Sequence, residues 1–231
     1  MKKAMKAAMV AALVMVSAAA SAQFSVNVGY VNTGVSFDPD VAMDAETPDY
    51  KGSDLLSTHG ISLGVGYDMS IQGGFGLGLG LNYTLGFNSK KLASLGDASV
   101  SMKGNSHALD VPVRVTYTYP ISDNFKVFGF AGPKFVYALA GQSKMSFKGV
   151  DDADEEEPIY WYGKDKEDRF SLDLNPFDIK LGVGAGVNIS NILVKVGYDW
   201  GMLNAAKKEV FEDDDTKIKS NQFYVTVGYA F

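Results

Sequence analysis

The sequence predicts an all-β fold: an eight-stranded antiparallel up-and-down transmembrane β-barrel with short periplasmic turns and long extracellular loops. Three observations predict it: an N-terminal export signal, eight segments in which apolar and polar residues alternate, and connections that alternate between short and long. Alternation with a period of two is the pattern of a strand whose two faces meet different surroundings. Long strands joined by alternating short turns and long loops are typical of outer-membrane barrels.

The first 22 residues predict a secretory signal peptide. Lys2, Lys3 and Lys6 precede an apolar run from Ala7 to Ala20, and Ala20-Ser21-Ala22 is a cleavage site of small residues. The alternative is a membrane anchor helix, but the run is shorter than the ~18–20 residues that a span needs. Cleavage after Ala22 divides the chain into a signal peptide, 1–22, and a barrel domain, 23–231.

Charge and cysteine content narrow the function classes. The net charge is −6, and loss of the three signal-peptide lysines makes it −9, which argues against nucleic acid as a partner. The chain has no Cys, so it forms no disulfides and is not a lipoprotein. No later segment is apolar enough to be a transmembrane helix, so a membrane-spanning form must be a closed barrel.

Each of the eight alternating segments is about as long as a tilted membrane strand, which needs ~9–11 residues. In chain order they are Phe24–Asn32, Ile61–Met69, Phe75–Phe87, His107–Tyr119, Phe125–Ala140, Phe177–Ile189, Ile192–Met202 and Phe223–Phe231. The last is the clearest, because its outward parity is entirely apolar and it stops on an aromatic residue: Phe223, Val225, Val227, Tyr229 and Phe231.

The connections fall into two classes. Residues 70–74, 120–124 and 190–191 are tight turns, and residues 34–60, 88–106, 141–176 and 203–222 are long polar loops. With an even strand number, both ends of the barrel domain lie on the periplasmic side. This orientation gathers outward aromatic residues into two girdles, as expected at the two membrane interfaces. The alternative is a soluble lipocalin-like barrel, with its apolar face turned inward around a ligand.

If the apolar faces meet lipid, the opposite parity places charged residues of both signs in the lumen. Eight strands leave an interior just wide enough for side chains, and buried charges must be paired. We therefore expect a network of ion pairs that plugs the barrel. The alternative is a charged conduction path. The predicted lumen residues are Asp68, Asp110, Arg114, Asp178, Lys180, Lys195 and Asp199.

The segment 125–140 allows two registers. In the first, Lys126, Phe128, Phe130 and Lys134 face inward, and the two rings cover inward glycines of segment 177–189, a packing that strand glycines favour. In the second, a bulge near Gly132-Pro133 switches the register, because Pro cannot donate to the ladder. The first register is preferred.

Two glycine-rich strings and two histidines are the remaining motifs with a chemical interpretation. Residues 74–80 and 182–186 have glycines at a strict spacing of two with no helix after them, so they are inward small residues and not nucleotide loops. His59 and His107 fall at outer strand ends, with Asp54, Ser57 and Ser106 nearby in sequence. A hydrolase at the barrel rim is the less favoured interpretation, and the chain is expected to be no enzyme and to bind no cofactor.

Acidic runs occupy two of the long loops. They are Asp151, Asp152, Asp154, Glu155, Glu156 and Glu157, and residues 212–215. They are expected to be solvated tips that can contact a partner. The alternative is divalent-cation binding, although neither run has the EF-hand spacing. Tyr160-Trp161-Tyr162 follows the first run and is expected to be either a recognition tip or loop packing.

Two short motifs carry a family resemblance. Leu109-Asp110-Val111-Pro112-Val113 and Phe130-Ala131-Gly132-Pro133, with later strands and a final Phe, resemble the porin-like outer-membrane β-barrels of Bacteroidota, the PorT-type group. That group usually has Glu where this chain has Asp110. The resemblance implies an eight-stranded barrel in the outer membrane of a Gram-negative bacterium, with the last strand recognised by the barrel-assembly machinery.

The expected function is that of a small, non-enzymatic outer-membrane protein with a structural or surface-interaction role through its acidic loops. A narrow channel for small solutes is the alternative. The expected partners are outer-membrane lipid and the assembly machinery, and a surface or secretion-system protein stays open as a further partner. No nucleic acid or metal is expected.

Overall fold

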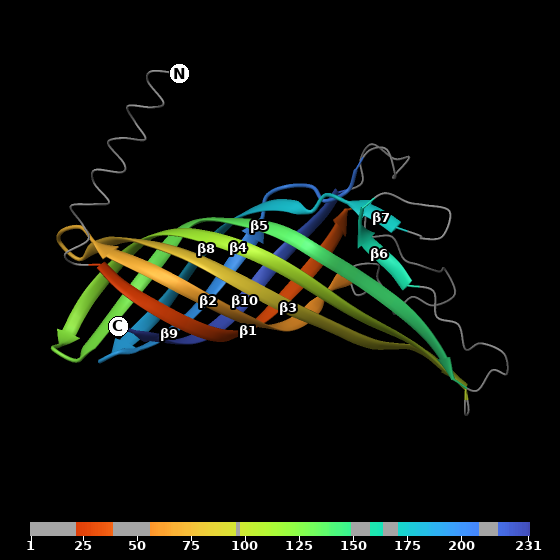
Figure 1. Cartoon of the computed structure of the whole chain (residues 1–231), viewed down its shortest axis with the longest axis horizontal. Coiled ribbons are helices and arrows are strands. Elements are labelled where there is room, and N and C mark those ends of the chain that lie inside the picture. The colour runs from red at the N-terminus through yellow and green to blue at the C-terminus, as the bar shows by residue number, and fades with distance from the viewer. Residues whose placement is uncertain (1–21, 39–55, 96–97, 149–157, 164–170, 208–216) are drawn as a thin grey trace, which may run out of the picture.

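The strands of the computed structural model close into a single twisted barrel (Figure 1). The structure describes residues 22–38, 56–95, 98–148, 158–163, 171–207 and 217–231. The predicted signal peptide lies outside them except for Ala22, where the first strand begins. No helix in these ranges is long and apolar enough to cross a membrane.

Eight long antiparallel strands form the ring, as predicted. Its order is β4-β3-β2-β1-β10-β9-β8-β5, and pairing of β4 with β5 closes it. Two short strands lie outside the ring: β6 pairs with β5, and β7 pairs with β6. The bounds are β1 Ala22–Asp38, β2 Thr58–Ser70, β3 Phe75–Leu95, β4 Ala98–Ser122, β5 Phe125–Lys148, β6 Pro158–Tyr162, β7 Ser171–Leu174, β8 Phe177–Ile189, β9 Ile192–Gly201 and β10 Lys217–Ala230.

Alternation along each strand separates an apolar outer wall from a polar interior. Outward residues such as Phe24, Leu63 and Val115 have more than half of their surface exposed, at 63, 57 and 57%. Inward residues such as Asp199 and Lys180 are buried, at 0 and 2%. A soluble barrel would bury the apolar face, so this arrangement excludes the lipocalin-like alternative for the described strands.

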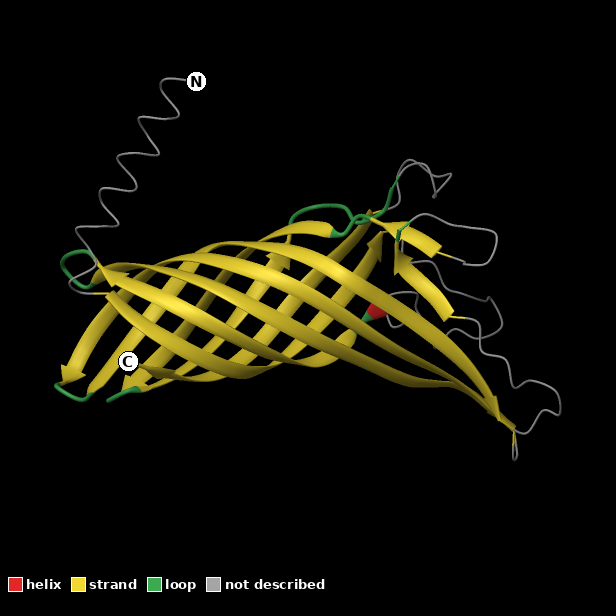
Figure 2. Cartoon of the chain, in the orientation of Figure 1, coloured by secondary structure: helices red, strands yellow, loops and turns green. Residues whose placement is uncertain are grey.

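The strands extend further than predicted at the end with the long connections. The prediction that residues 88–106 form a loop is wrong, because β3 and β4 continue as a hairpin to the pair Leu95 and Ala98. The predicted loop 141–176 contains the end of β5 together with β6 and β7. The sequence pattern weakens there because these strand ends lie beyond the hydrocarbon layer, where polar residues can face outward. Figure 2 shows the extension projecting past the barrel mouth.

Strand β5 follows the first of the two predicted registers. Its pairing with β8 continues without a shift through Gly132 and Pro133. Phe130 and Phe128 lie opposite Gly184 and Gly186, and a Cβ atom on either glycine would approach the ring to 2.2 or 2.5 Å. The two rings therefore occupy the space that the glycines leave in the lumen.

Candidate functional site: the charged lumen and its outer cap

A cluster of three ionised side chains lies across the middle of the lumen. Asp199 on β9 has no exposed surface, and its Oδ1 lies 2.5 Å from Nη2 of Arg114 on β4. Its Oδ2 forms an ion pair with Lys134 on β5. A buried carboxylate between two cations is compensated, whereas any one of the three alone would be costly. The cluster joins three strands across the interior.

Local backbone features give this cluster its space. Gly182 lies opposite Asp199 in the ladder, and a Cβ atom there would fall 1.7 Å from the Asp199 Oδ1. Pro133 has no N–H for the ladder, and the carbonyl of the preceding Gly132 accepts a hydrogen bond from Nη1 of Arg114. Glycine at position 182 and the Gly-Pro step on β5 thus adapt the barrel wall to the charges.

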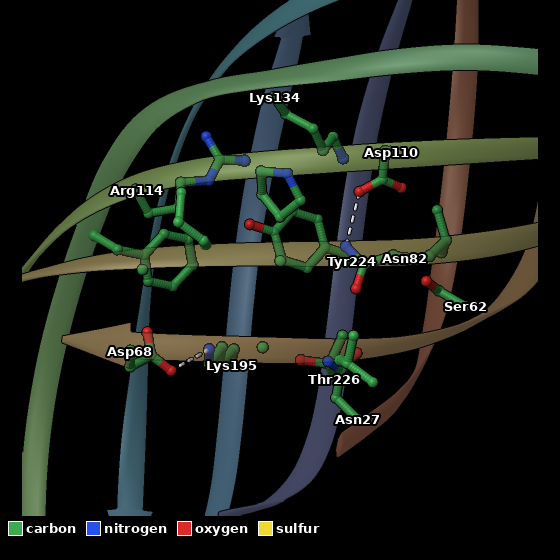
Figure 3. Close-up of a pocket in the computed structure, with 18 of the residues that line it drawn as sticks. Asn27, Ser62, Asp68, Asn82, Asp110, Arg114, Lys134, Lys195, Tyr224 and Thr226 are labelled. Carbon is green, nitrogen blue, oxygen red and sulfur yellow. Dashed lines mark hydrogen bonds and ion pairs between the residues drawn. The ribbon is translucent and has the colours of Figure 1, made fainter. Parts of the chain in front are cut away.

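A second carboxylate and two polar side chains extend the cluster towards β3 and β10. Asp110 is buried and accepts a hydrogen bond of 2.7 Å from the side-chain amide of Asn82. Lys134 donates to Oε1 of Gln222, and its ammonium lies 5.2 Å from the centre of the Tyr224 ring. Figure 3 shows the bond between Asp110 and Asn82 in this pocket, with Tyr224 among the lining residues.

Separate ion pairs lie at the two ends of the lumen: the outer end, where the long connections are, and the inner end, where the tight turns are. Towards the outer end, Lys180 donates to the Ser220 backbone oxygen at 2.6 Å and lies 3.5 Å from Asp178. Towards the inner end, Lys195 lies 3.9 Å from Asp68, and both side chains are about one-third exposed. All seven residues of the predicted lumen set therefore face inward, at three levels along the barrel.

Lys126 and Lys134 are the inward lysines that the predicted set omits. Lys134 belongs to the central cluster, and Lys126 lines the cavity at the inner end. The preferred register of segment 125–140 already turns both inward, so strand parity is the signal that identifies them. With both lysines included, the inward charged residues are five cations and four carboxylates: Arg114, Lys126, Lys134, Lys180 and Lys195 against Asp68, Asp110, Asp178 and Asp199.

Cavities remain between these side chains. One of about 110 Å³ lies at the central cluster, one of about 120 Å³ at the outer end and one of about 400 Å³ at the inner end. The central cavity is lined by polar side chains and has room for several water molecules.

The outer end of the barrel is covered by an apolar cap. Leu56, Trp161, Leu174 and Ile218 form a buried cluster, with Trp161 only 4% exposed. The Trp161 indole N–H donates to Oγ of Ser143 at 2.9 Å. Of the two expectations for Tyr160-Trp161-Tyr162, loop packing is correct for Trp161.

Burial also changes the acidity of one cap residue. Burial, together with the nearby Asp178 carboxylate, raises the pKa of Tyr162 to about 12. Its hydroxyl therefore stays neutral to a higher pH than that of an exposed tyrosine.

The two predicted rim histidines pair with tyrosines on neighbouring strands. His59 and His107 lie on the outer wall and are hydrogen-bonded to Tyr30 and Tyr83, respectively. Ser106 belongs to the opposite parity of β4 and lines the outer cavity. Asp54 lies outside the described residues. Within the described ranges, no group of three His, Cys, Asp or Glu residues is arranged to hold a metal ion.

The remaining predicted residues are divided between β10 and a segment that is not described. The five apolar residues of the predicted last strand all face outward and are 37–72% exposed: Phe223, Val225, Val227, Tyr229 and Phe231. The acidic run 151–157 and the run 212–215 lie outside the described residues.

Comparisons with known proteins agree with this architecture. A family model described as "Outer membrane protein beta-barrel domain" matches residues 7–231. A search of curated proteins finds no match. The chain is similar to the structure of Ail, the attachment invasion locus protein of Yersinia pestis, in complex with the heparin analogue sucrose octasulfate. The sequence identity is 16%, the match covers 91% of this chain and 99% of that one, and the TM-score is 0.45.

Two further solved structures are similar to this chain at comparably low sequence identity. Neisserial surface protein A is 13% identical over 91% of this chain and 99% of that one, with a TM-score of 0.37. OprG of Pseudomonas aeruginosa is 12% identical over 91% of this chain and 96% of that one, with a TM-score of 0.42.

Proposed function

We propose that this chain, which belongs to the outer membrane protein β-barrel domain family, is a plugged, non-enzymatic barrel with a structural or surface-interaction role in the cell envelope. The protein is a small outer-membrane β-barrel of a Gram-negative bacterium. The observation that carries the proposal is the Arg114–Asp199–Lys134 cluster, which spans the lumen and leaves a cavity of about 110 Å³ beside it.

Two features favour a plugged barrel over an open pore. The central ions are paired and buried, so moving them aside would separate buried charges. The outer mouth is covered by the cap around Trp161. Both features favour a closed barrel over the alternative of a narrow solute channel.

Planar-bilayer recording tests the plug. We expect the purified, folded protein to give no unitary conductance steps beyond those of a protein-free bilayer. Reproducible steps would contradict the proposal and favour the channel. In that event, recordings of Asp199→Asn would tell whether ions pass the central cluster, because loss of a luminal carboxylate would change the cation-to-anion selectivity of a luminal path but not that of a defect around the barrel.

The surface-interaction part of the proposal rests on the acidic runs. A carboxylate-rich segment in an extracellular connection suits a basic protein surface as its partner. On intact cells, a photo-crosslinker at position 153 should give a defined protein adduct. Replacing the six acids of the run 151–157 by Asn or Gln should remove that adduct. An adduct unchanged by this replacement would contradict the acidic run as the contact.

Calcium separates the partner hypothesis from the cation hypothesis. Neither acidic run has the EF-hand spacing, so we expect millimolar calcium to leave loop proteolysis and thermal unfolding unchanged. Calcium-dependent protection of the loop from protease would favour a cation site.

The remaining finer assignments are part of the same proposal. Membership of the PorT-type group of Bacteroidota rests on the Leu109–Val113 and Phe130–Pro133 motifs, and a secretion-system partner rests on that resemblance alone. Recognition by the barrel-assembly machinery rests on the outward apolar row of β10. The absence of enzymatic activity rests on the outward position of His59 and His107. A lipase or protease activity lost on replacing both histidines would contradict it.

A further inference from the structure

The outward wall carries lysines just beyond its last aromatic residue on β3. Phe87 is 49% exposed, and its rung of the ladder continues through Asn105 on β4 to Gln142 on β5. The next outward rung consists of Ser89, Lys103 and Lys144, all three exposed. Aromatic girdles lie at the membrane interface, so the next rung lies at the height of the lipid headgroups.

Lys103 and Lys144 are direct cross-strand partners. Directly opposed residues have Cβ atoms ~4.5–5.5 Å apart, and like charges in that position destabilise a sheet. No described carboxylate forms an ion pair with either lysine. An anion held between the two ammonium groups would remove the repulsion.

A second column of lysines lies on the opposite side of the ring. On β10, the outward residues that precede Phe223 in sequence, and lie beyond it towards the outer end, are Asn221, Lys219 and Lys217. Both lysines are exposed. Strand β10 is four strands away from β4 in either direction around the eight-stranded ring. Lys217 lies opposite Asp38 in the ladder, whereas Lys219 lies opposite Ser36. The cationic wall is therefore not confined to one hairpin.

From this placement we propose that Lys103 and Lys144 form a binding site for the phosphate groups of the phosphorylated glycolipid, lipid A, in the outer leaflet, and that Lys219, on the opposite side of the ring, contacts the phosphate of a separate lipid A molecule. Ammonium groups bind phosphate oxygens through charge-assisted hydrogen bonds. The neutral polar residues Asn105 and Gln142, one rung closer to the hydrocarbon, can contact the sugar hydroxyl groups. The site is on the barrel exterior, so it is independent of the luminal plug.

Membrane lipid suits this site better than a soluble polyanion does. The lysines face outward from the wall, where outer-leaflet lipid is already adjacent to them. A soluble polyanion such as a sulfated glycan must instead approach a chain whose net charge is −6. Each lysine near an anionic lipid surface contributes enough binding free energy for about a fivefold change in affinity.

Binding of lipid A to the folded protein in detergent tests the proposal. We expect the wild type to bind bisphosphorylated lipid A at least about tenfold more tightly than dephosphorylated lipid A. Replacing both lysines, Lys103→Gln and Lys144→Gln, should weaken binding of the phosphorylated form by about 25-fold. The matched control, Lys126→Gln with Lys207→Gln, removes two charges elsewhere, and binding should stay within twofold of the wild type. Heat-modifiable gel migration shows which variants are folded.

The wild-type comparison requires no variant and overturns the proposal by itself if the two lipids bind equally. Equal weakening by the control pair would also overturn it, because the effect would then follow net charge alone. Competition by millimolar inorganic phosphate at the lysine pair would support the phosphate chemistry. Binding of heparin oligosaccharides that depends on Lys103 and Lys144, without binding of lipid A, would overturn the lipid and assign the site to a soluble polyanion.

Discussion

Replacing Asp199 by Asn should lower the free energy of unfolding by about 3–5 kcal/mol, because it leaves Arg114 and Lys134 buried without their shared counter-ion. Asn has nearly the same shape as Asp, so the contact with Gly182 is kept and the charge alone is changed. Urea titration of the protein in lipid vesicles, followed by the gel mobility of the folded barrel, measures the change.

Two comparison variants separate the charge effect from a general sensitivity of the lumen. Asp68→Asn removes the carboxylate of a partly exposed pair whose N···O distance is 3.9 Å, and should cost less than about 1 kcal/mol. Combining Arg114→Met with Asp199→Asn leaves Lys134 with Asp110 as counter-charges in the same pocket. This double variant should recover at least half of the lost stability. A double variant that is less stable than Asp199→Asn would contradict the account.

Replacing Phe130 by Ala should cost about 3–5 kcal/mol in the free energy of unfolding. Its ring is 8% exposed, fills the space beside Gly184 and lies beneath the Arg114 guanidinium, whose Cζ is 6.0 Å from the ring centre. Removal of the ring leaves a cavity beside a buried cation. The facing glycine, Gly184 on β8, has no side chain that could fill it. The same urea titration gives the measurement.

Phe128→Ala is the matched control for Phe130→Ala. Phe128 makes the corresponding contact with Gly186, but it lies nearer the inner end and is only half-buried. Its removal should cost about half as much, because water can enter the space that it leaves. Equal losses for the two variants would show that ring volume, and not burial beside the ion cluster, determines the effect.

Strand parity explains most of what could be predicted. Period-two alternation identifies all eight ring strands and the inward side of every residue in the predicted lumen set. For β5, parity leaves two registers, and the structure adopts the preferred one, in which Phe128 and Phe130 cover the glycines of β8. The information is local, since each residue's side of the sheet follows from its neighbours two positions away.

The parts that could not be predicted depend on contacts between distant segments. The pairing of Asp199 with Arg114 joins residues 85 positions apart, and parity says which side chains are inside but not which of them meet. The β3–β4 hairpin beyond the hydrocarbon layer carries polar residues that resemble a loop in sequence. The cap requires Trp161 to pack with Leu56 and Ile218, which are brought together only when the barrel closes.

The seam between β1 and β10 determines how such a chain can enter a membrane. The two strands pair from Ser25 with Ala230 to Asp38 with Lys217, so the first and last strands of the ring complete each other. Until β10 arrives, the edge of β1 presents unpaired backbone groups that lipid cannot satisfy. These contacts have almost the largest sequence separation that the chain allows, and such contacts form late in folding. A partly folded sheet is thus unsuited to the bilayer, and insertion and closure must be completed as a single event.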